Sequence, residues 1–598
     1  MVELDRQIKD AHDDDNVGAY AYLDDLLAQG EGSAMIELYT SKWTQLLPQQ
    51  TGCHFSNKKG ACKLLLGKPR APDDPIFQQA KEAGIEICTE GVEVLGIPIG
   101  TPEFIDNHIA EIIKKPTRDL EVIKYFSKQH QWALLRYCIN QRVTHLQRSV
   151  DINRGSDSMK QFDNLVTNHI MGMMDIPPGK QDEFLERVSE LRGMPLMLSG
   201  GGIQHTGELD VRIRAQRRAR HRVRQYLAEH DPLKIPHVEE MWRNSDFVVT
   251  HITPTEDFNA QAKPKEAIQS HLKGHTLGSI PHQAVTQKQR PGIPANTPRD
   301  QIMQETEEDY MASKVVKHTE VMTELVNSTQ QNKSLGHQLA AQVLSSSCAN
   351  TGSLLRRLPN FRNVTNDDQW ATMLRVRMGV PVTMTEGNWM CNCNAKEVID
   401  KAYRLEIEGS NIEVCHGNNL SLQPMHGLYC PGRWNKVVNR HDRVRDALAK
   451  AIGKFEDIQA VSIEPAVRNA RNSAGARADI RVTKGGTHYY LDIGIICPAA
   501  PGHVNKLKTH ERPGAAADWY VQQKMSKYKD ADNYRPIVIE TGGRIADASI
   551  EFLDSLIEEK DDDCIAKRRS LYLTIIDEMT RQNTRMMTAI VKETARLQ

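Results

Sequence analysis

Long apolar runs are missing from this sequence: no stretch approaches the roughly 20 residues that a helix needs to cross a bilayer. Met1 is followed by VELDRQIKDAHDDD, which is acidic and polar rather than an apolar signal core. Cysteine is also scarce, with 11 in 598 residues and most of them far apart, which does not fit a disulfide framework. We therefore expect a soluble, nuclear or cytoplasmic protein that has no membrane partner and is not secreted through a signal peptide.

An excess of charge of one sign is absent too, because 76 Lys and Arg stand against 77 Asp and Glu. Any binding to nucleic acid must therefore depend on local patches. The clearest patch runs from Val211 to Arg224, where seven arginines occur without one acid. Arg214, Arg218 and Arg222 are four residues apart and share one face of a predicted helix, which favours nucleic-acid binding. An ordinary solvated helix face is the alternative.

The length and the changes of pattern along the chain predict a multidomain α/β and α protein. Short apolar runs between turn signals favour strands near the start, and helical periodicity follows. A stretch rich in Pro, Gln, Lys and Thr then predicts a linker. The expected units are an α/β unit (1–103), a helical unit (104–254), the linker (255–301), a helical connector (302–389), a cysteine-bearing segment (390–440) and a final α/β unit (441–598).

Two adjacent acids, Asp24 and Asp25, follow Tyr22 and Leu23 between apolar stretches. Adjacent acids at the tip of a hairpin can hold magnesium against the phosphates of a nucleotide. A plain surface turn is the better explanation of this motif when it is taken alone. Three further segments follow it in order: TGCHFSNKKGACKLL (Thr51–Leu65), VEVLGIPIG (Val92–Gly100) and LRGMPLMLSGGGI (Leu191–Ile203).

Together these segments resemble the reverse transcriptases of LINE-type (non-LTR) retrotransposons, which are RNA-directed DNA polymerases, over roughly residues 18 to 250. The resemblance implies a truncated polymerase palm in residues 1–103 and a helical thumb in residues 104–254. It also implies that Lys58 or Lys59 lies near the incoming nucleotide. Polymerisation with two metals needs a third carboxylate from an upstream strand, and only 21 residues precede Tyr22. We therefore expect no polymerase activity from this chain.

A zinc site is predicted in residues 390–440. Cys391 and Cys393 provide two close thiols, and His426 and Cys430 provide a His/Cys pair, so the four side chains can close a tetrahedral Zn²⁺ site. The spacing of the first pair is tighter than zinc sites usually have. Unrelated buried cysteines are the alternative.

The resemblance to LINE proteins supports this zinc site, because those proteins place a Cys-Cys-His-Cys element directly after the thumb. In the family this element ends in an Arg-His pair, which corresponds here to Arg440 and His441. Cys415 and His416 lie inside the segment and are competing ligands. The implied role of the zinc is to stiffen the joint between the thumb and the last unit.

The last unit carries the most specific set of residues. RADIRV and HYYLDIGI predict consecutive strands joined by the turn KGG, which brings Asp479 and Asp492 to neighbouring positions of one sheet. A later helix carries Lys524 and Lys527, and we expect Glu464 on a preceding helix. Acids of this kind bind Mg²⁺ or Mn²⁺, the metal activates water, and a lysine positions the water or stabilises charge on a phosphate. RPIVIETGGRI (Arg535–Ile545) predicts a further core strand.

This set resembles the PD-(D/E)xK restriction-like endonucleases found at the C-terminus of one class of LINE elements, which also carry a Lys-x-x-Lys-Tyr helix, here ending at Tyr528. The resemblance implies a Mg-dependent DNA endonuclease that nicks target DNA during target-primed reverse transcription and transposition, with the element's RNA and the target DNA as partners. Gly494 stands where the family has a lysine, as if the lysine had moved to the helix. The alternative is a non-catalytic nucleic-acid-binding remnant of a decayed element.

Overall fold

The computed structural model describes residues 18–22, 25–29, 32–46, 62–66, 70–230, 236, 298–327, 333–348, 351–359, 365–383, 391, 419–420, 423–430, 433–466, 477–528, 531–557 and 562–595. The chain divides into two compact units. The first holds residues 1–114 and 149–158, and the second holds residues 115–148 and 159–598. The protein is mixed α/β and mostly helical, with small sheets, in agreement with the expected class. No helix in the described ranges is long and apolar enough to cross a membrane.

The first unit contains three small two-stranded sheets and short helices. Strands β1 (Gly18–Tyr22) and β2 (Asp25–Gln29) pair antiparallel, and Tyr22 lies opposite Asp25. Three of the predicted site residues, Asp24, Lys58 and Lys59, lie outside the described residues. The other elements are α2 (Gly32–Glu37), α4 (Pro75–Glu82), β3 (Lys63–Leu65) parallel to β4 (Glu86–Cys88), and β5 (Gly91–Val94) antiparallel to β6 (Ile97–Gly100), with β1 at Gly18–Tyr22 and β2 at Asp25–Gln29.

The second unit begins with helices, as the pattern after residue 104 predicts. Helix α5 (Pro102–Ile123) and helix α8 (Ser156–Met173) each start in the first unit and continue into the second. Helix α15 begins at Pro298, inside the predicted linker, so the linker was drawn a few residues too long. The remaining helices of this part are α6 (Lys128–Leu134), α7 (Thr144–Ser149), α9 (Gln181–Gly193), α10 (Leu209–His230), α15 (Pro298–Asn327), α16 (Lys333–Ser345) and α17 (Asp367–Arg377).

A buried carboxylate, Asp163 on α8, fixes the loop that carries the three consecutive glycines. It accepts hydrogen bonds from the backbone N–H of Thr206 and of Gly207, both at 2.8 Å, and from the Arg192 guanidinium at 3.1 Å. Arg192 also donates to the carbonyl of Ile203 at 3.2 Å. A buried charge needs such partners to offset its desolvation. The loop at 200–207 is therefore held in place by α8 and α9.

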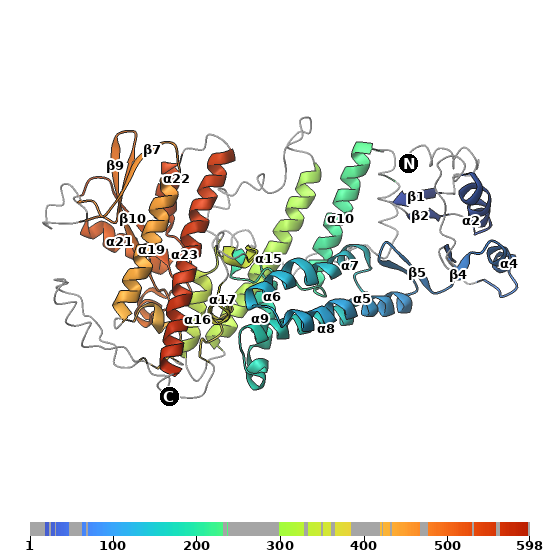
Figure 1. The fold of residues 1–598 in the computed structure, drawn as a ribbon, viewed down its shortest axis with the longest axis horizontal. Coiled ribbons are helices and arrows are strands. Elements are labelled where there is room, and N and C mark those ends of the chain that lie inside the picture. Colours follow the sequence, from blue (N-terminus) through green and yellow to red (C-terminus); the bar gives the residue numbers. More distant parts are fainter. Residues whose placement is uncertain are drawn as a thin grey trace, which may run out of the picture. The chain divides into compact units, whose positions relative to one another are not determined.

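The last part of the chain forms a four-stranded sheet in the order β10-β9-β8-β7 (Figure 1). Strand β9 pairs antiparallel with β8 and parallel with β10, and β7 lies at the edge. The two strands and the further core strand predicted from the sequence are thus confirmed. The elements are α19 (Trp434–Ile452), β7 (Ile458–Ile463), β8 (Ile480–Lys484), β9 (Thr487–Ile496), α20 (Pro501–Leu507), α21 (Ala515–Lys527), β10 (Tyr534–Glu540), α22 (Asp547–Leu556) and α23 (Asp562–Ala595).

Side chains alternate between the two faces of this sheet, as the period of a strand requires. Leu491 and Ile493 of β9 belong to the core that α19, α22 and α23 cover. Ile496 and Val538 belong to a second cluster, against Ala516 and Ala517 of α21. Even-numbered positions of β9 therefore face α21. Asp492 shares that face, so its carboxylate lies on the side of the sheet where the lysine-bearing helix packs.

The β8–β9 turn gives a test of the predicted hairpin. Gly485 and Gly486 occupy the two turn positions at φ 55° and 75°, a conformation that costs a residue with a Cβ about 1–2 kcal/mol. Gly485→Ala should therefore lower the free energy of unfolding by about 1 kcal/mol, whereas Gly485→Asn should leave it close to the parent value, because Asn tolerates this region. Urea unfolding of both variants checks this. Equal losses for Ala and Asn would contradict it.

Candidate active site and cysteine-histidine cluster

Asp479 and Asp492 meet because the tight hairpin aligns the segment before β8 with the middle of β9. Asp479 comes directly before β8, and its backbone N–H donates to the carbonyl of Leu491 at 3.0 Å. The backbone N–H of Ile493 in turn donates to Oδ2 of Asp479 at 2.6 Å. Burial raises the pKa of Asp492, and the charge of Asp479 raises it too, so the two carboxylates sense each other. The sheet thus brings together the two acids that the sequence singled out.

Lys524 of α21 reaches Asp492 directly. Its Nζ donates to Oδ2 of Asp492 at 2.6 Å and to the carbonyl of Ile493 at 3.2 Å. The Tyr534 hydroxyl donates to the same Oδ2 at 2.5 Å. Burial lowers the pKa of Lys524, but the charge and hydrogen bond of Asp492, together with the charges of Tyr520 and Asp479, outweigh burial and hold that pKa above its ordinary value. The lysine therefore stays charged beside the carboxylates.

Gly494 explains how the lysine can come from a helix. A Cβ at this position would lie 2.7 Å from Cε1 of Tyr520 and 2.9 Å from Cε of Lys524. Both distances are shorter than real Cβ contacts, so any side chain here would displace α21 or the lysine. The space that a lysine on the strand would use is filled by the side chain of Lys524.

His441 belongs to the same cluster, and the sequence analysis missed this role by assigning the residue to the zinc segment. It lies on α19, with Nε2 3.1 Å from Oδ2 of Asp479 and Nδ1 3.3 Å from Oδ1 of Asp442. Burial lowers the pKa of His441, but the hydrogen bond and charge of Asp479 outweigh it and raise the pKa. Burial raises the pKa of Asp479, but the hydrogen bond and charge of His441, together with the hydrogen bonds of Ile493 and Asp492, outweigh burial and lower that pKa. The sequence offers one signal for this role: His441 and Arg445 are four residues apart and therefore share one face of a helix.

Glu464 is not on a helix, contrary to the prediction. It directly follows the edge strand β7, at φ 51°, and its backbone N–H donates to the carbonyl of Asp479 at 3.0 Å. The carboxylate is 53% exposed, and Oε1 accepts from Arg445 at 2.7 Å. A strand that pairs with β8 leaves no room for the helix expected at this point. Glu464 thus lies next to the site, and Arg445 holds its carboxylate.

Lys527 and Tyr528 lie one turn beyond Lys524. The Nζ of Lys527 lies 5.3 Å from the centre of the Tyr528 ring, and that ring packs against Tyr534 at a centroid distance of 4.5 Å. Tyr534 is the residue that donates to Asp492. Of the two predicted lysines, Lys524 is therefore the one bonded to an acid of the cluster.

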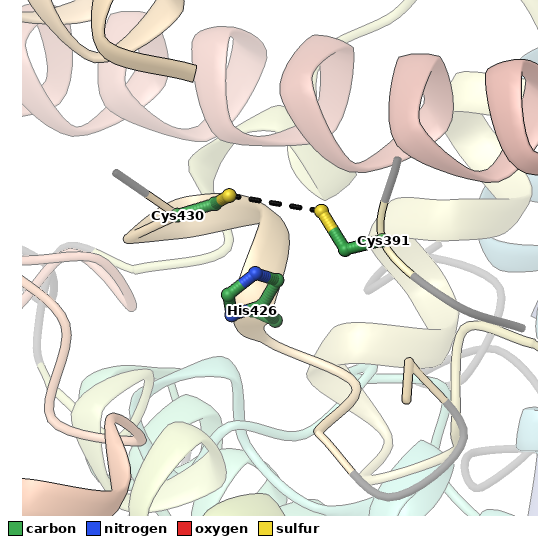
Figure 2. A group of neighbouring side chains, drawn as sticks. All are labelled: Cys391, His426 and Cys430. Carbon is green, nitrogen blue, oxygen red and sulfur yellow. Dashed lines mark hydrogen bonds between the residues drawn. The ribbon is translucent and has the colours of Figure 1, made fainter. Parts of the chain in front are cut away.

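Cys391, His426 and Cys430 form a buried cluster whose ligand atoms all lie within 4.8 Å of one another. Figure 2 shows the two thiols side by side above the imidazole. Their Sγ atoms are 3.7 Å apart, close to the ~3.8 Å that Zn–S bonds of 2.3 Å give at a tetrahedral angle. The three side chains could therefore bind a metal ion such as zinc. The predicted Cys393 and the competing Cys415 and His416 lie outside the described residues.

Local structure and packing hold this cluster. His426 begins a 3₁₀ turn, η9 (His426–Leu428), and the N–H of Cys430 donates to the carbonyl of His426 at 2.9 Å, which brings the two ligands to one side of the turn. Ile590 of α23 packs against both cysteines in a small apolar core. The cluster is thus attached to the helix that also covers the C-terminal sheet.

The arginine-rich helix α10 is present where the sequence predicts it. The guanidinium of Arg214 lies 4.1 Å from the centre of the Tyr310 ring on α15, so this arginine packs against another helix. Arg218 is half-buried and Arg222 is exposed. Of the three arginines chosen for nucleic-acid binding, Arg222 is thus the one with an exposed side chain.

The cysteine-histidine cluster leads to a metal-content prediction. The purified chain should carry about one zinc, and Cys391→Ser or Cys430→Ser should remove it, because each change takes away a thiolate ligand. Cys348→Ser is the matched control, since Cys348 is also buried but lies outside the cluster. Atomic absorption gives the metal content and a thermal melt in chelator gives the stability. No zinc in the parent chain, together with a melt that chelator leaves unchanged, would contradict the assignment.

Comparison with known proteins adds no name to this geometry. No protein-family model matches the sequence, and no curated protein matches it.

Proposed function

We propose that residues 441–598 nick target DNA by metal-dependent hydrolysis of a phosphodiester bond. In this proposal the nuclease is attached to an RNA-directed DNA polymerase region of LINE type and acts in target-primed reverse transcription. The observation that carries it is the meeting of two half-buried carboxylates, Asp479 and Asp492, beside the charged Lys524. Perturbed acids next to a cation are typical of catalytic sites.

The donor set fits a divalent cation. Asp479 and Asp492 offer carboxylate oxygens, which are the ligands that Mg²⁺ and Mn²⁺ prefer. The charge of Asp479 raises the pKa of Asp492, and the two neighbouring acids therefore repel each other. A cation held between them would relieve that repulsion. A metal bound by this pair would supply an activated water and a Lewis acid for the phosphate.

The side chains around the carboxylates have separate tasks in this proposal. Lys524 can neutralise charge that develops on the phosphate, because a positioned cation in a partly buried site stabilises such charge strongly. His441 fixes the orientation of Asp479 through its Nε2 contact at 3.1 Å. Tyr534 does the same for Asp492. Partners that orient metal ligands are worth about 10–100-fold in metal affinity or activity.

Two features support the wider part of the proposal. The β1–β2 hairpin places Asp25 next to a two-residue turn, the arrangement expected for the acidic motif of a polymerase palm. The cysteine-histidine cluster precedes the proposed nuclease in the chain, in the order found in LINE proteins. The element's RNA and the target DNA are the proposed partners.

The nicking activity is tested on supercoiled plasmid with Mg²⁺ or Mn²⁺. Asp479→Ala and Asp492→Ala should each reduce the rate by more than about a hundredfold, since each removes a proposed metal ligand and this exceeds the effect of a merely orienting partner. Glu456→Ala is the matched control, because this acid is 91% exposed and lies outside the cluster. Lys524→Ala should lower turnover at saturating DNA, whereas Lys527→Ala should weaken binding in a salt-sensitive way.

Two outcomes would sink the nuclease proposal. One is a double aspartate variant that nicks as fast as the parent chain. The other is a parent chain that binds DNA normally but cleaves it with neither metal. The non-catalytic nucleic-acid-binding remnant would then be the better account.

A further inference from the structure

Four arginines from distant parts of the chain lie together in the second unit, and we call them the arginine cluster. Arg136 belongs to the helical turn η2 (Leu135–Ile139), Arg356 ends the 3₁₀ turn η8 (Ser353–Arg356), Arg377 ends α17, and Arg569 lies on α23. Within the part of the chain that the structure describes, no carboxylate forms an ion pair with any of them. The cluster therefore gathers positive charge that no carboxylate among the described residues offsets through an ion pair.

The charges are close enough to act on one another. Partial burial of the guanidinium lowers the pKa of Arg356, and the charge of Arg569 lowers it further. Burial lowers the pKa of Arg136 too, and the charge of Arg356 acts in the same direction. Burial, with the charges of Arg356 and Arg136, lowers the pKa of Arg377 to about 9. Repulsion thus runs through the whole cluster.

Specific contacts hold the cluster in place. The guanidinium of Arg136 donates to the carbonyl of Gly201 at 3.0 Å and lies 5.5 Å from the centre of the Tyr137 ring. The Tyr137 hydroxyl donates to the backbone carbonyl of Arg356 at 2.7 Å. Arg377 donates from Nε to the carbonyl of Gly200 at 3.0 Å. These bonds all end on neutral carbonyls, so they fix the geometry and leave the charge.

The plain alternative is that the four arginines are ordinary solvated surface residues. The burial of Arg377 does not fit this alternative. This side chain is buried, and a buried charge without an acidic partner is costly. The buried charge of Arg377, in one cluster with the exposed Arg356 and Arg569, lowers the stability of the fold. An anion bound by the cluster would offset this cost. Departures of this kind from local stability are expected at functional positions.

The size of the cavity beside Arg377 limits where an anion can bind. Arg377 also lines a cavity of about 50 Å³ together with Gly352, Ser353 and Asn583, which has room for waters rather than for a nucleotide. The ligand must therefore bind at the surface, over Arg356 and Arg569, whose side chains are exposed. Tyr137 lies beside them and is 43% exposed. An aromatic ring next to a row of cations is the usual arrangement for a single strand of nucleic acid.

We propose that Arg136, Arg356 and Arg569 bind backbone phosphates of a single-stranded nucleic acid, while Tyr137 stacks against one of its bases. The choice of nucleic acid rests on the proposed function. The site itself is built from other elements than the carboxylates Asp479 and Asp492. It would hold a strand, such as RNA or an unpaired end of DNA, that the nuclease centre does not cut.

Binding of a fluorescein-labelled single-stranded oligodeoxynucleotide to the full chain tests the proposal. Fluorescence anisotropy is measured over a range of KCl concentrations, without Mg²⁺ or Mn²⁺ so that no cleavage occurs. Arg356→Gln and Arg569→Gln should each weaken binding by roughly tenfold and lower the slope of log affinity against log salt by about 0.7. Arg585→Gln is the matched control, because Arg585 is exposed on the same helix as Arg569 and lies outside the cluster.

The stacking role needs its own pair of variants. Tyr137→Leu should weaken binding roughly tenfold without changing the salt slope, since a stacked base contributes no charge. Tyr137→Phe should bind like the parent chain, because it keeps the ring and loses only the bond to Arg356. A Phe variant as weak as the Leu variant would show that Tyr137 acts through the position of Arg356 instead.

The outcomes separate this inference from the proposed nuclease. Arginine variants that bind with the affinity and salt slope of Arg585→Gln would overturn the inference, even if the parent chain nicks plasmid. A parent chain that does not nick plasmid, with arginine variants that still lose binding, would remove the nuclease and keep the site. A thermal melt of each variant shows that it is folded.

Discussion

The ion pair between Lys524 and Asp492 joins helix α21 to strand β9 and decides how the C-terminal site is built. Nζ and Oδ2 are 2.6 Å apart, and taking two such charges out of water costs several kcal/mol for each ion. The pair therefore demands close geometry. Gly494 provides it, because any Cβ there would collide with Tyr520 and Lys524. The second acid, Asp479, adds a like charge that the lysine alone does not balance, which makes the site suited to a cation.

Helix α23 connects three features of the second unit. Its Ile575 and Met579 lie in the core of the four-stranded sheet, and its Ile590 packs against the cysteines of the cysteine-histidine cluster. The same helix carries Arg569 of the arginine cluster. Packed interiors transmit small displacements. A metal at the cysteines would therefore stabilise the end of a helix on which both the sheet and the arginines depend.

The sequence was sufficient where the signals are local. The KGG turn and the alternation along HYYLDIGI predict the hairpin and the meeting of Asp479 with Asp492, because strand period and turn chemistry act over a few residues. His441 was missed because only the packing of α19 brings it to Asp479. Glu464 was placed on a helix although pairing with β8 extends a strand to it. The arginine cluster has no sequence pattern, since only the folded chain brings Arg136 and Arg569 near Arg356.

The central claim is that Asp479 and Asp492 hold one divalent cation together. Anomalous X-ray diffraction from crystals of the chain grown with Mn²⁺ tests it directly. The account predicts a manganese peak within coordination distance of both carboxylates, about 2.0–2.6 Å for oxygen ligands of such ions, and no such peak in Asp492→Ala crystals. A saturating Mn²⁺ concentration that leaves no peak between the two carboxylates, with Lys524 still bonded to Asp492, would contradict it.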